Sequence, residues 1–222
     1  MAGIVASTCL LVIDVTWLAV VHPPALTWLA AWFAALAVAG AFVPGVANQV
    51  TLARAHLAGP ALVYSLLPSR LIELAAVVGL AGLSDLVDGA VARLMERPSR
   101  LGGALDPVVD GIFFGAVAAG LAAGGAYPSW LALVVVTRYG LPALVGAGLL
   151  LAGRRPALEH TPLGQASTTL IALLLGAIAL VRGVGWEAGG LLAVSEVAMP
   201  VSALATFANL FWANRPAILG SR

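Results

Sequence analysis

Charged residues are scarce in this chain, and their scarcity excludes a soluble globular protein. Only 9% of the 222 residues are charged and 61% are hydrophobic, whereas a soluble domain carries about 25% charged residues. A chain this apolar has too little polar surface to face water on all sides, so lipid must be its solvent. At about 20 residues per membrane span, the length allows about six to eight helices and leaves no room for a separate soluble domain.

Cysteine is nearly absent from the chain, and lysine is absent. The single cysteine, Cys9, excludes an intrachain disulfide, and no lipobox-like stretch precedes it, so a small apolar helix residue explains it better than a lipidated one. All eleven basic residues are arginine. The formal net charge of +1 says little about partners; we expect the lipid bilayer to be one and nucleic acid not to be.

Long apolar runs dominate what is present. Residues 2–21 and 25–43 form two runs separated by a His-Pro-Pro turn, and the first lacks a basic leader and a cleavage site, so we interpret it as a retained helix. Six further apolar spans follow, near residues 47–68, 71–93, 105–127, 129–153, 164–184 and 191–212. We expect the first of these to begin with a polar interfacial turn. The pattern predicts an all-α, polytopic membrane helical bundle with six core transmembrane helices plus an N-terminal helical hairpin.

The arginines predict the orientation of this bundle. When the six later spans are threaded in order, only Arg70 and Arg182 fall at one face, and Arg138 lies within a span. The other eight fall at the opposite face: Arg54, Arg93, Arg97, Arg100, Arg154, Arg155, Arg215 and Arg222. Basic residues accumulate on the cytoplasmic side of a membrane. We therefore expect an inner (cytoplasmic) membrane protein whose arginine-rich face is cytoplasmic.

Two pairs of aspartates carry the chemistry. Asp85 and Asp88 are three residues apart on one predicted helix, and Asp106 and Asp110 are four apart on the next, so each pair shares a helix face. A short connection makes the two helices antiparallel neighbours, and the four carboxylates converge. Each charged aspartate inside a bilayer costs about 2.5–3.5 kcal/mol, and cations would relieve their repulsion. Oxygen-only ligands favour a hard ion, Mg²⁺ or Mn²⁺, with one or two ions bound.

Small residues and an arginine accompany the aspartates. Gly89 and Ala92 continue the stripe of the first pair, so a bulky ligand could lie against the helix backbone. Gly102 keeps the entry to the second helix open, and Arg93 is placed to meet a phosphate or to extend to the membrane interface.

The complete pattern, D-x2-D-G-x2-A-R-x8-G-x3-D-x3-D, resembles the signature of the CDP-alcohol phosphotransferase family, also called CDP-alcohol phosphatidyltransferases. Its fixed positions are Asp85, Asp88, Gly89, Ala92, Arg93, Gly102, Asp106 and Asp110. Upstream, Asn48, Thr51 and Arg54 resemble the N-x2-T-x2-R stretch common before the first core span in that family. The resemblance covers about residues 47 to 215.

The resemblance implies a function and a division of the chain. Residues 1–46 would be an N-terminal transmembrane hairpin without an assigned function, and residues 47–222 the catalytic membrane domain. The domain would transfer a substituted phosphate from CDP-diacylglycerol, or another CDP-alcohol, to a hydroxyl acceptor in phospholipid biosynthesis, releasing CMP. The family also implies a homodimer.

The resemblance further implies roles for individual residues. Asp106 and Asp110 would be catalytic, with Asp110 a shared metal ligand or the general base. The metal ligands would be Asp85, Asp88, Asp106 and Asp110. The nucleotide site would consist of Asp85, Asp88, Gly89, Ala92, Arg93, Gly102, Asn48, Thr51 and Arg54.

Three other arginines are candidates for the acceptor. Arg138 lies near the middle of a span, where an unpaired guanidinium is costly, so it must face a polar cavity or a partner. Arg154 and Arg155 could extend that pocket, although a cytoplasmic anchor explains them equally well. Gln165 stands where several family members carry lysine in a G-K-x2-T-like segment, which weakens an assignment to the glycerol-phosphate branch.

Two other functions fit a polytopic chain with intramembrane acids. A divalent-cation transporter would place such residues near the midplane of broken helices, whereas here they lie toward one end beside a basic loop. A catalytically inactive membrane subunit would not need all four aspartates.

Overall fold

The computed structural model describes the backbone of residues 2–95, 100–154 and 161–219, and the side chains of residues 3–84, 105–154 and 161–215. The described residues are helical apart from short connections, so the prediction of an all-α protein is confirmed. The α-helices, with the single 3₁₀ turn η1, are α1 (Ala2–Val21), α2 (Leu26–Phe42), α3 (Val46–Leu66), η1 (Pro68–Arg70), α4 (Leu71–Met95), α5 (Arg100–Ala123), α6 (Ser129–Leu151), α7 (Pro162–Gly183) and α8 (Gly189–Leu219).

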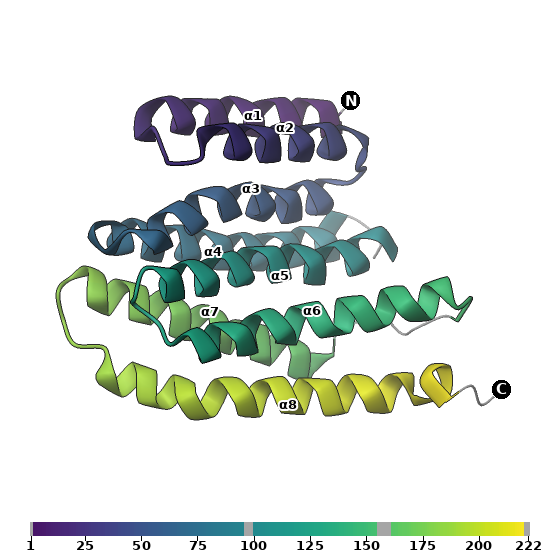
Figure 1. Cartoon of the computed structure of the whole chain (residues 1–222). Coiled ribbons are helices and arrows are strands. Elements are labelled where there is room, and N and C mark those ends of the chain that lie inside the picture. The colour runs from purple at the N-terminus through teal and green to yellow at the C-terminus, as the bar shows by residue number, and fades with distance from the viewer. Residues whose placement is uncertain (1, 96–99, 155–160, 220–222) are drawn as a thin grey trace.

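The helices lie roughly side by side and are stacked in layers (Figure 1). The α1–α2 hairpin packs on α3, which in turn packs on α4 and α5. Helix α6 packs on α5, α7 packs on α4, and α8 closes the bundle against α6 and α7. The main apolar core lies between α3, α4, α5, α6 and α7, with Phe113, Leu121, Leu131, Leu175 and Ile178 fully buried.

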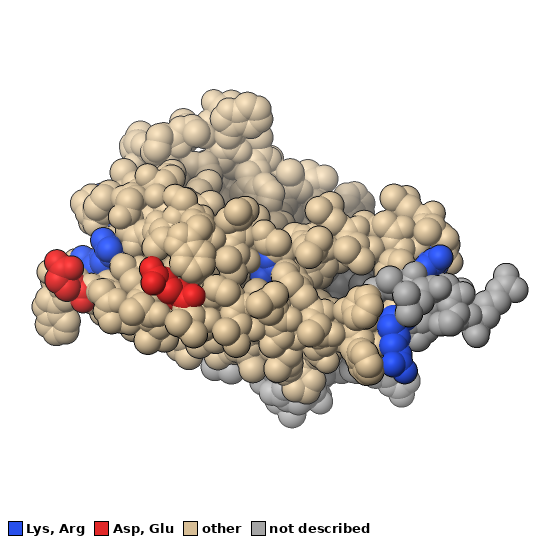
Figure 2. Space-filling model, turned by 60° about the horizontal axis from the view of Figure 1, so that its bottom comes forward, with Lys and Arg blue, Asp and Glu red and all other residues tan. Residues whose placement is uncertain are grey.

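Within the described part of the chain, five helices are long and apolar enough to cross a membrane: α1, α5, α6, α7 and α8, over ranges that include Gly3–Val21 and Ser129–Leu151. Large apolar side chains such as Trp28 and Leu144 are exposed. The described surface visible in Figure 2 is mostly uncharged, with a few small groups of charged atoms. These features indicate an integral membrane protein.

Helix α3 differs from the expectation at its start. The polar segment after Gly45 is not an interfacial turn, because the helix begins at Val46 and runs unbroken past Pro60 to Leu66. Most of α3 is buried, including six polar or charged side chains: Asn48, Gln49, Thr51, Arg54, His56 and Ser65. Protein on both sides, rather than lipid or water, surrounds these side chains. Their partners make the polar stretch compatible with a helix inside the bundle.

Candidate functional site

One face of α3 carries the three upstream residues of the motif. Asn48, Thr51 and Arg54 are spaced by three residues, so they fall in one row along the helix. The Asn48 side-chain amide donates to the carbonyl of Pro44 at 2.6 Å, and the Thr51 hydroxyl donates to the carbonyl of Ala47 at 3.2 Å. All three side chains are buried. Arg54, at the end of this row, points toward α4 and α5, where the aspartates of the motif lie.

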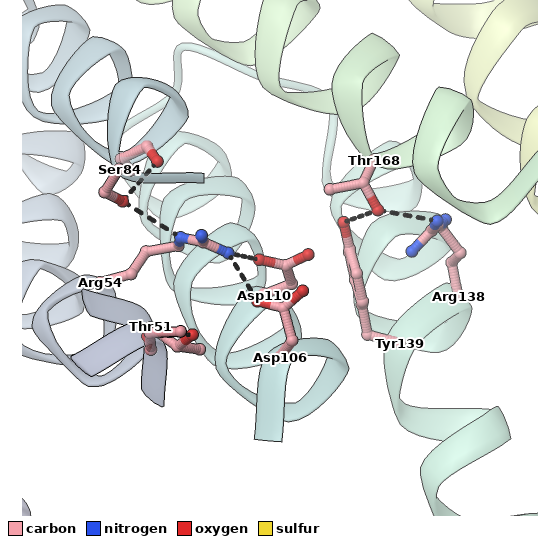
Figure 3. Close-up of polar contacts among 10 residues, drawn as sticks. Thr51, Arg54, Ser84, Asp106, Asp110, Arg138, Tyr139 and Thr168 are labelled. Atoms are coloured by element: carbon pink, nitrogen blue, oxygen red, sulfur yellow. Dashed lines mark hydrogen bonds and ion pairs between the residues drawn. The ribbon is translucent and has the colours of Figure 1, made fainter. Parts of the chain in front are cut away.

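Arg54 connects α3 to both aspartates of α5. Its NH1 group donates to Asp106 Oδ1 at 3.3 Å and to Asp110 Oδ1, and its Nε lies 3.5 Å from Ser84 Oγ of α4 (Figure 3). Arg54 is only 1% exposed. A guanidinium buried this deeply is tolerable only with anionic and hydrogen-bonding partners. The three helices are thus joined by one charge network.

The two carboxylates differ in their access to solvent. The Asp106 side chain is 27% exposed and the Asp110 side chain 7%. Because one turn of α5 separates them and both reach the same NH1 group, their oxygens converge on a small volume. Clustered carboxylate oxygens suit a hard divalent cation. Asp106, at the more open side, is the better placed of the two to meet an incoming ligand.

Part of the predicted site lies outside the described side chains. These residues are Asp85, Asp88, Gly89, Ala92, Arg93, Gly102 and Arg155. Among the side chains that the structure does describe, no group of three or more His, Cys, Asp or Glu residues could hold a metal ion. The metal site of four carboxylates therefore stays a prediction.

A second polar cluster surrounds Arg138 on α6. Its Nε donates to Ser167 Oγ at 2.9 Å, and its NH2 group donates to Thr168 Oγ1 at 3.1 Å and to the carbonyl of Gly164 at 3.0 Å. The guanidinium carbon also lies 4.2 Å from the centre of the Tyr139 ring. Arg138 was expected to need a polar cavity or a partner, and residues at the start of α7 are its partners.

Tyr139 brings this cluster beside the aspartates. A Cβ atom added to Gly111, the residue after Asp110, would lie 2.9 Å from Tyr139 Cβ, so α5 and α6 are in close contact there. The Tyr139 hydroxyl lies 3.4 Å from Thr168 Oγ1. In Figure 3, Arg54 lies on one side of Asp106 and Asp110, and Tyr139 with Thr168 lies on the other. The aspartates are therefore flanked by two polar groups from opposite sides of the bundle.

Two of the acceptor candidates, Arg138 and Arg154, lie far apart. Arg154 is exposed and follows the end of α6 at Leu151. At 1.5 Å per residue, the 13 helical residues from 138 to 151 separate it from Arg138 by about 20 Å along the axis. Ser84, Tyr139, Ser167 and Thr168 were not among the predicted site residues. Two features of the sequence could have indicated three of them. Ser84 directly precedes the first aspartate of the motif, and Ser167 and Thr168 lie in the segment compared with G-K-x2-T.

The comparisons with known proteins identify the family of this chain. The family model described as CDP-alcohol phosphatidyltransferase matches residues 45–208. The chain belongs to the CDP-alcohol phosphatidyltransferase family, which confirms the resemblance seen in its motif. The expected enzyme class, a transferase of substituted phosphate groups, is confirmed by the same match, and it is favoured over a cation transporter.

Curated relatives are similar to parts of the chain. A provisionally named cardiolipin synthase from Mycobacterium tuberculosis is 37% identical over 129 residues, covering 55% of this chain and 58% of the relative. A cardiolipin synthase (CMP-forming) from Streptomyces coelicolor is 34% identical over 112 residues, 50% of this chain and 52% of the relative. An archaetidylinositol phosphate synthase from Methanothermobacter thermautotrophicus is 44% identical over 55 residues, 25% and 28%. The matches thus span little more than half the length of these relatives at most. No solved structure matches the chain.

Proposed function

We propose that this chain transfers the phosphatidyl group of CDP-diacylglycerol to a hydroxyl acceptor, releasing CMP, as a step in phospholipid biosynthesis. The observation that carries the proposal is the family match over residues 45–208, within which the motif aspartates Asp106 and Asp110 converge on a buried arginine. An integral membrane enzyme keeps a lipid donor within its own leaflet, which suits the five apolar helices.

The proposed acceptor is a lipid hydroxyl. Two of the relatives reported above are cardiolipin synthases, one of them CMP-forming. Cardiolipin contains two phosphatidyl groups on one glycerol, so a CMP-forming synthesis takes phosphatidylglycerol as acceptor. The archaetidylinositol phosphate synthase makes an inositol phosphate the second acceptor to test. Arg138 would bind the phosphate of the acceptor.

The chemistry follows from the residues around α5. The acceptor oxygen attacks the β-phosphorus, the bond from that phosphorus to the oxygen bridging to the α-phosphorus breaks, and CMP leaves with that oxygen. Asp110 accepts the hydroxyl proton, and Arg54 offsets negative charge close to the reacting phosphate. Mg²⁺ or Mn²⁺ held by Asp85, Asp88, Asp106 and Asp110 would neutralise charge on the diphosphate. The nucleotide would lie against Gly89, Ala92, Arg93 and Gly102, with Asn48 and Thr51 beside it.

We also propose the following membrane arrangement. Helices α3 to α8 cross the inner membrane as a six-helix catalytic domain, residues 47–222, and residues 1–46 form a transmembrane hairpin. Alternating helix directions place the start of α3 and the ends of α6 and α8 at one end of the bundle, with Arg154 and Arg215 near it. The excess of arginine at that end supports a cytoplasmic active site. A homodimer is the proposed assembly.

The test is CMP release by purified protein given CDP-diacylglycerol, Mg²⁺ and, separately, phosphatidylglycerol, glycerol phosphate, inositol phosphate and serine. We expect CMP and cardiolipin with phosphatidylglycerol, loss of both with EDTA, and recovery with Mg²⁺ or Mn²⁺. Asp106→Asn should lower turnover by about 100-fold or more while leaving the protein folded. Glu73→Gln, which neutralises an exposed carboxylate paired with Arg70, is the matched control and should keep full activity. The absence of CMP with every acceptor would reject the proposal.

A further inference from the structure

Helix α3 is buried on two opposite faces, and only one of them is used by the site. The row of Thr51, Arg54 and Ala58 faces α4 and α5. The opposite row contacts the α1–α2 hairpin and consists of Gln49, Leu52, His56, Gly59 and Val63. Both rows advance by alternating steps of three and four residues, as packed helix faces do. Any contact that rotates or shifts α3 from the hairpin side therefore moves Arg54 on the other side.

The central contact on the hairpin side is a buried polar contact between Asp14 and His56. Asp14 Oδ2 of α1 lies 2.5 Å from His56 Nδ1, with Asp14 only 5% and His56 only 4% exposed. The Phe33 ring of α2 stacks on the His56 ring, with centroids 6.1 Å apart and planes inclined by 3°. A charged aspartate inside a membrane bundle is costly without a polar partner. Apolar contacts alone would hold the hairpin against α3 at a smaller free-energy cost. The buried polar pair therefore indicates that α1 must pack on α3 in one defined register.

Neighbouring contacts fix the same register over the length of α3. The Gln49 side-chain amide donates to the carbonyls of Gly40 and Val43, at 2.9 and 2.7 Å, at the end of α2. A Cβ atom added to Gly59 would lie 2.7 Å from Phe33. Close approaches of this kind leave little room for sliding.

The hairpin lies outside the region that the family model matches, which begins at residue 45. His56 is two residues from Arg54, about 3 Å along the helix axis and on the opposite face. We propose that Asp14 and His56 are positioning residues, which fix the rotation and register of α3 so that Arg54 reaches Asp106 and Asp110 together. The inference rests on the proposed function, since it gives the hairpin a role in the same phosphatidyl transfer.

The first test is kinetic and uses Asp14→Asn, which keeps the shape of the side chain and removes its charge. We expect kcat per folded molecule to fall by about 10- to 100-fold, as for a slightly misplaced catalytic group, with little change in the KM for CDP-diacylglycerol. The exchanged pair Asp14→His with His56→Asp should recover most of the lost kcat. An unchanged kcat in folded Asp14→Asn, or a folded exchanged pair as slow as the single variant, would overturn the proposal.

The matched control is Trp17→Phe. It removes the 2.7 Å hydrogen bond from Trp17 Nε1 to the Tyr64 hydroxyl, another contact between the hairpin and α3. Tyr64 is ten residues from Arg54, about 15 Å along the axis. This variant should lower the melting temperature but keep kcat within about twofold. An equal loss of kcat in Trp17→Phe and Asp14→Asn would show that the hairpin supports stability in general, and the proposal would be wrong.

A double-mutant cycle separates this proposal from the proposed function. The free energies of unfolding of Asp14→Asn, Arg54→Gln and the double variant are compared, with no activity needed. Residues without a shared contact normally give additive effects, whereas residues linked through one rigid element do not. We expect a non-additive result, and additive effects would overturn the positioning role. Non-additivity in a protein that releases no CMP would reject the proposed function alone. Should Asp14→Asn fail to fold, His56→Gln takes its place in both tests.

Discussion

Arg54 offers the sharpest test of how this site is built. Replacing it with glutamine removes the cation shared by Asp106 and Asp110. Breaking a buried ion pair by removing one partner costs about 3–5 kcal/mol. For a chain of this size, 1 kcal/mol shifts the melting temperature by about 2–4 °C. We therefore expect Arg54→Gln to melt about 6–20 °C below the wild type in EDTA.

Mg²⁺ should change that difference in a defined direction. Without Arg54, the two carboxylates repel each other, and a divalent cation between them would relieve the repulsion. Mg²⁺ is therefore expected to raise the melting temperature of Arg54→Gln more than that of the wild type, although it does not restore turnover. The assay is thermal unfolding of purified protein in detergent, with and without EDTA, followed by CMP release at a temperature where both proteins are folded.

The matched control is Arg70→Gln. Arg70 donates to Glu73 at 2.7 Å, but their side chains are 53% and 38% exposed, and such surface pairs contribute about 0–1 kcal/mol. Its melting temperature should stay within about 4 °C of the wild type. If Arg54→Gln melts as high as this control in EDTA, the network of Arg54 with both aspartates does not stabilise the bundle and the reasoning fails.

Further predictions concern the second polar cluster and the helix contacts. Arg138→Lys removes the guanidinium group that donates to two hydroxyls of α7. It should raise the KM for a phosphate-bearing acceptor and leave the KM for CDP-diacylglycerol within about twofold. Equal changes in both KM values would contradict an acceptor role. Gly120→Ala places a Cβ atom 1.7 Å from Ser65 Oγ and 2.8 Å from Ser65 Cβ. It should cost about 1–3 kcal/mol of stability, measured by thermal unfolding. Gly79→Ala, which has open space at that position, should not destabilise the protein.

The sequence alone was sufficient for the fold class and the family. The scarcity of charge and the long apolar runs require helices in lipid, because lipid cannot satisfy backbone hydrogen bonds. The spacing of Asp106 and Asp110 predicts a shared helix face, since a helix repeats every 3.6 residues. Both inferences use local periodicity or composition, which are properties of consecutive residues. The family match over residues 45–208 agrees with the motif that contains these two aspartates.

Helix α3 shows what composition and local periodicity could not predict. Hydropathy averages the polarity of neighbouring residues, so the segment from Asn48 to His56 resembled an interfacial turn. In the structure it is a buried helix, because partners far along the chain satisfy its polar groups. Arg54 meets Asp106 and Asp110, which follow it by 52 and 56 residues.

The role of the hairpin also depends on tertiary contacts. In the sequence, Asp14 is an isolated acid within the apolar run of residues 2–21, and His56 lies in the next polar stretch. They lie 42 residues apart, and packing of α1 on α3 brings them together. Sequence spacing determines which side chains share a face of one helix. The packing of different helices determines which faces meet, because burial and charge pairing are properties of the assembled bundle.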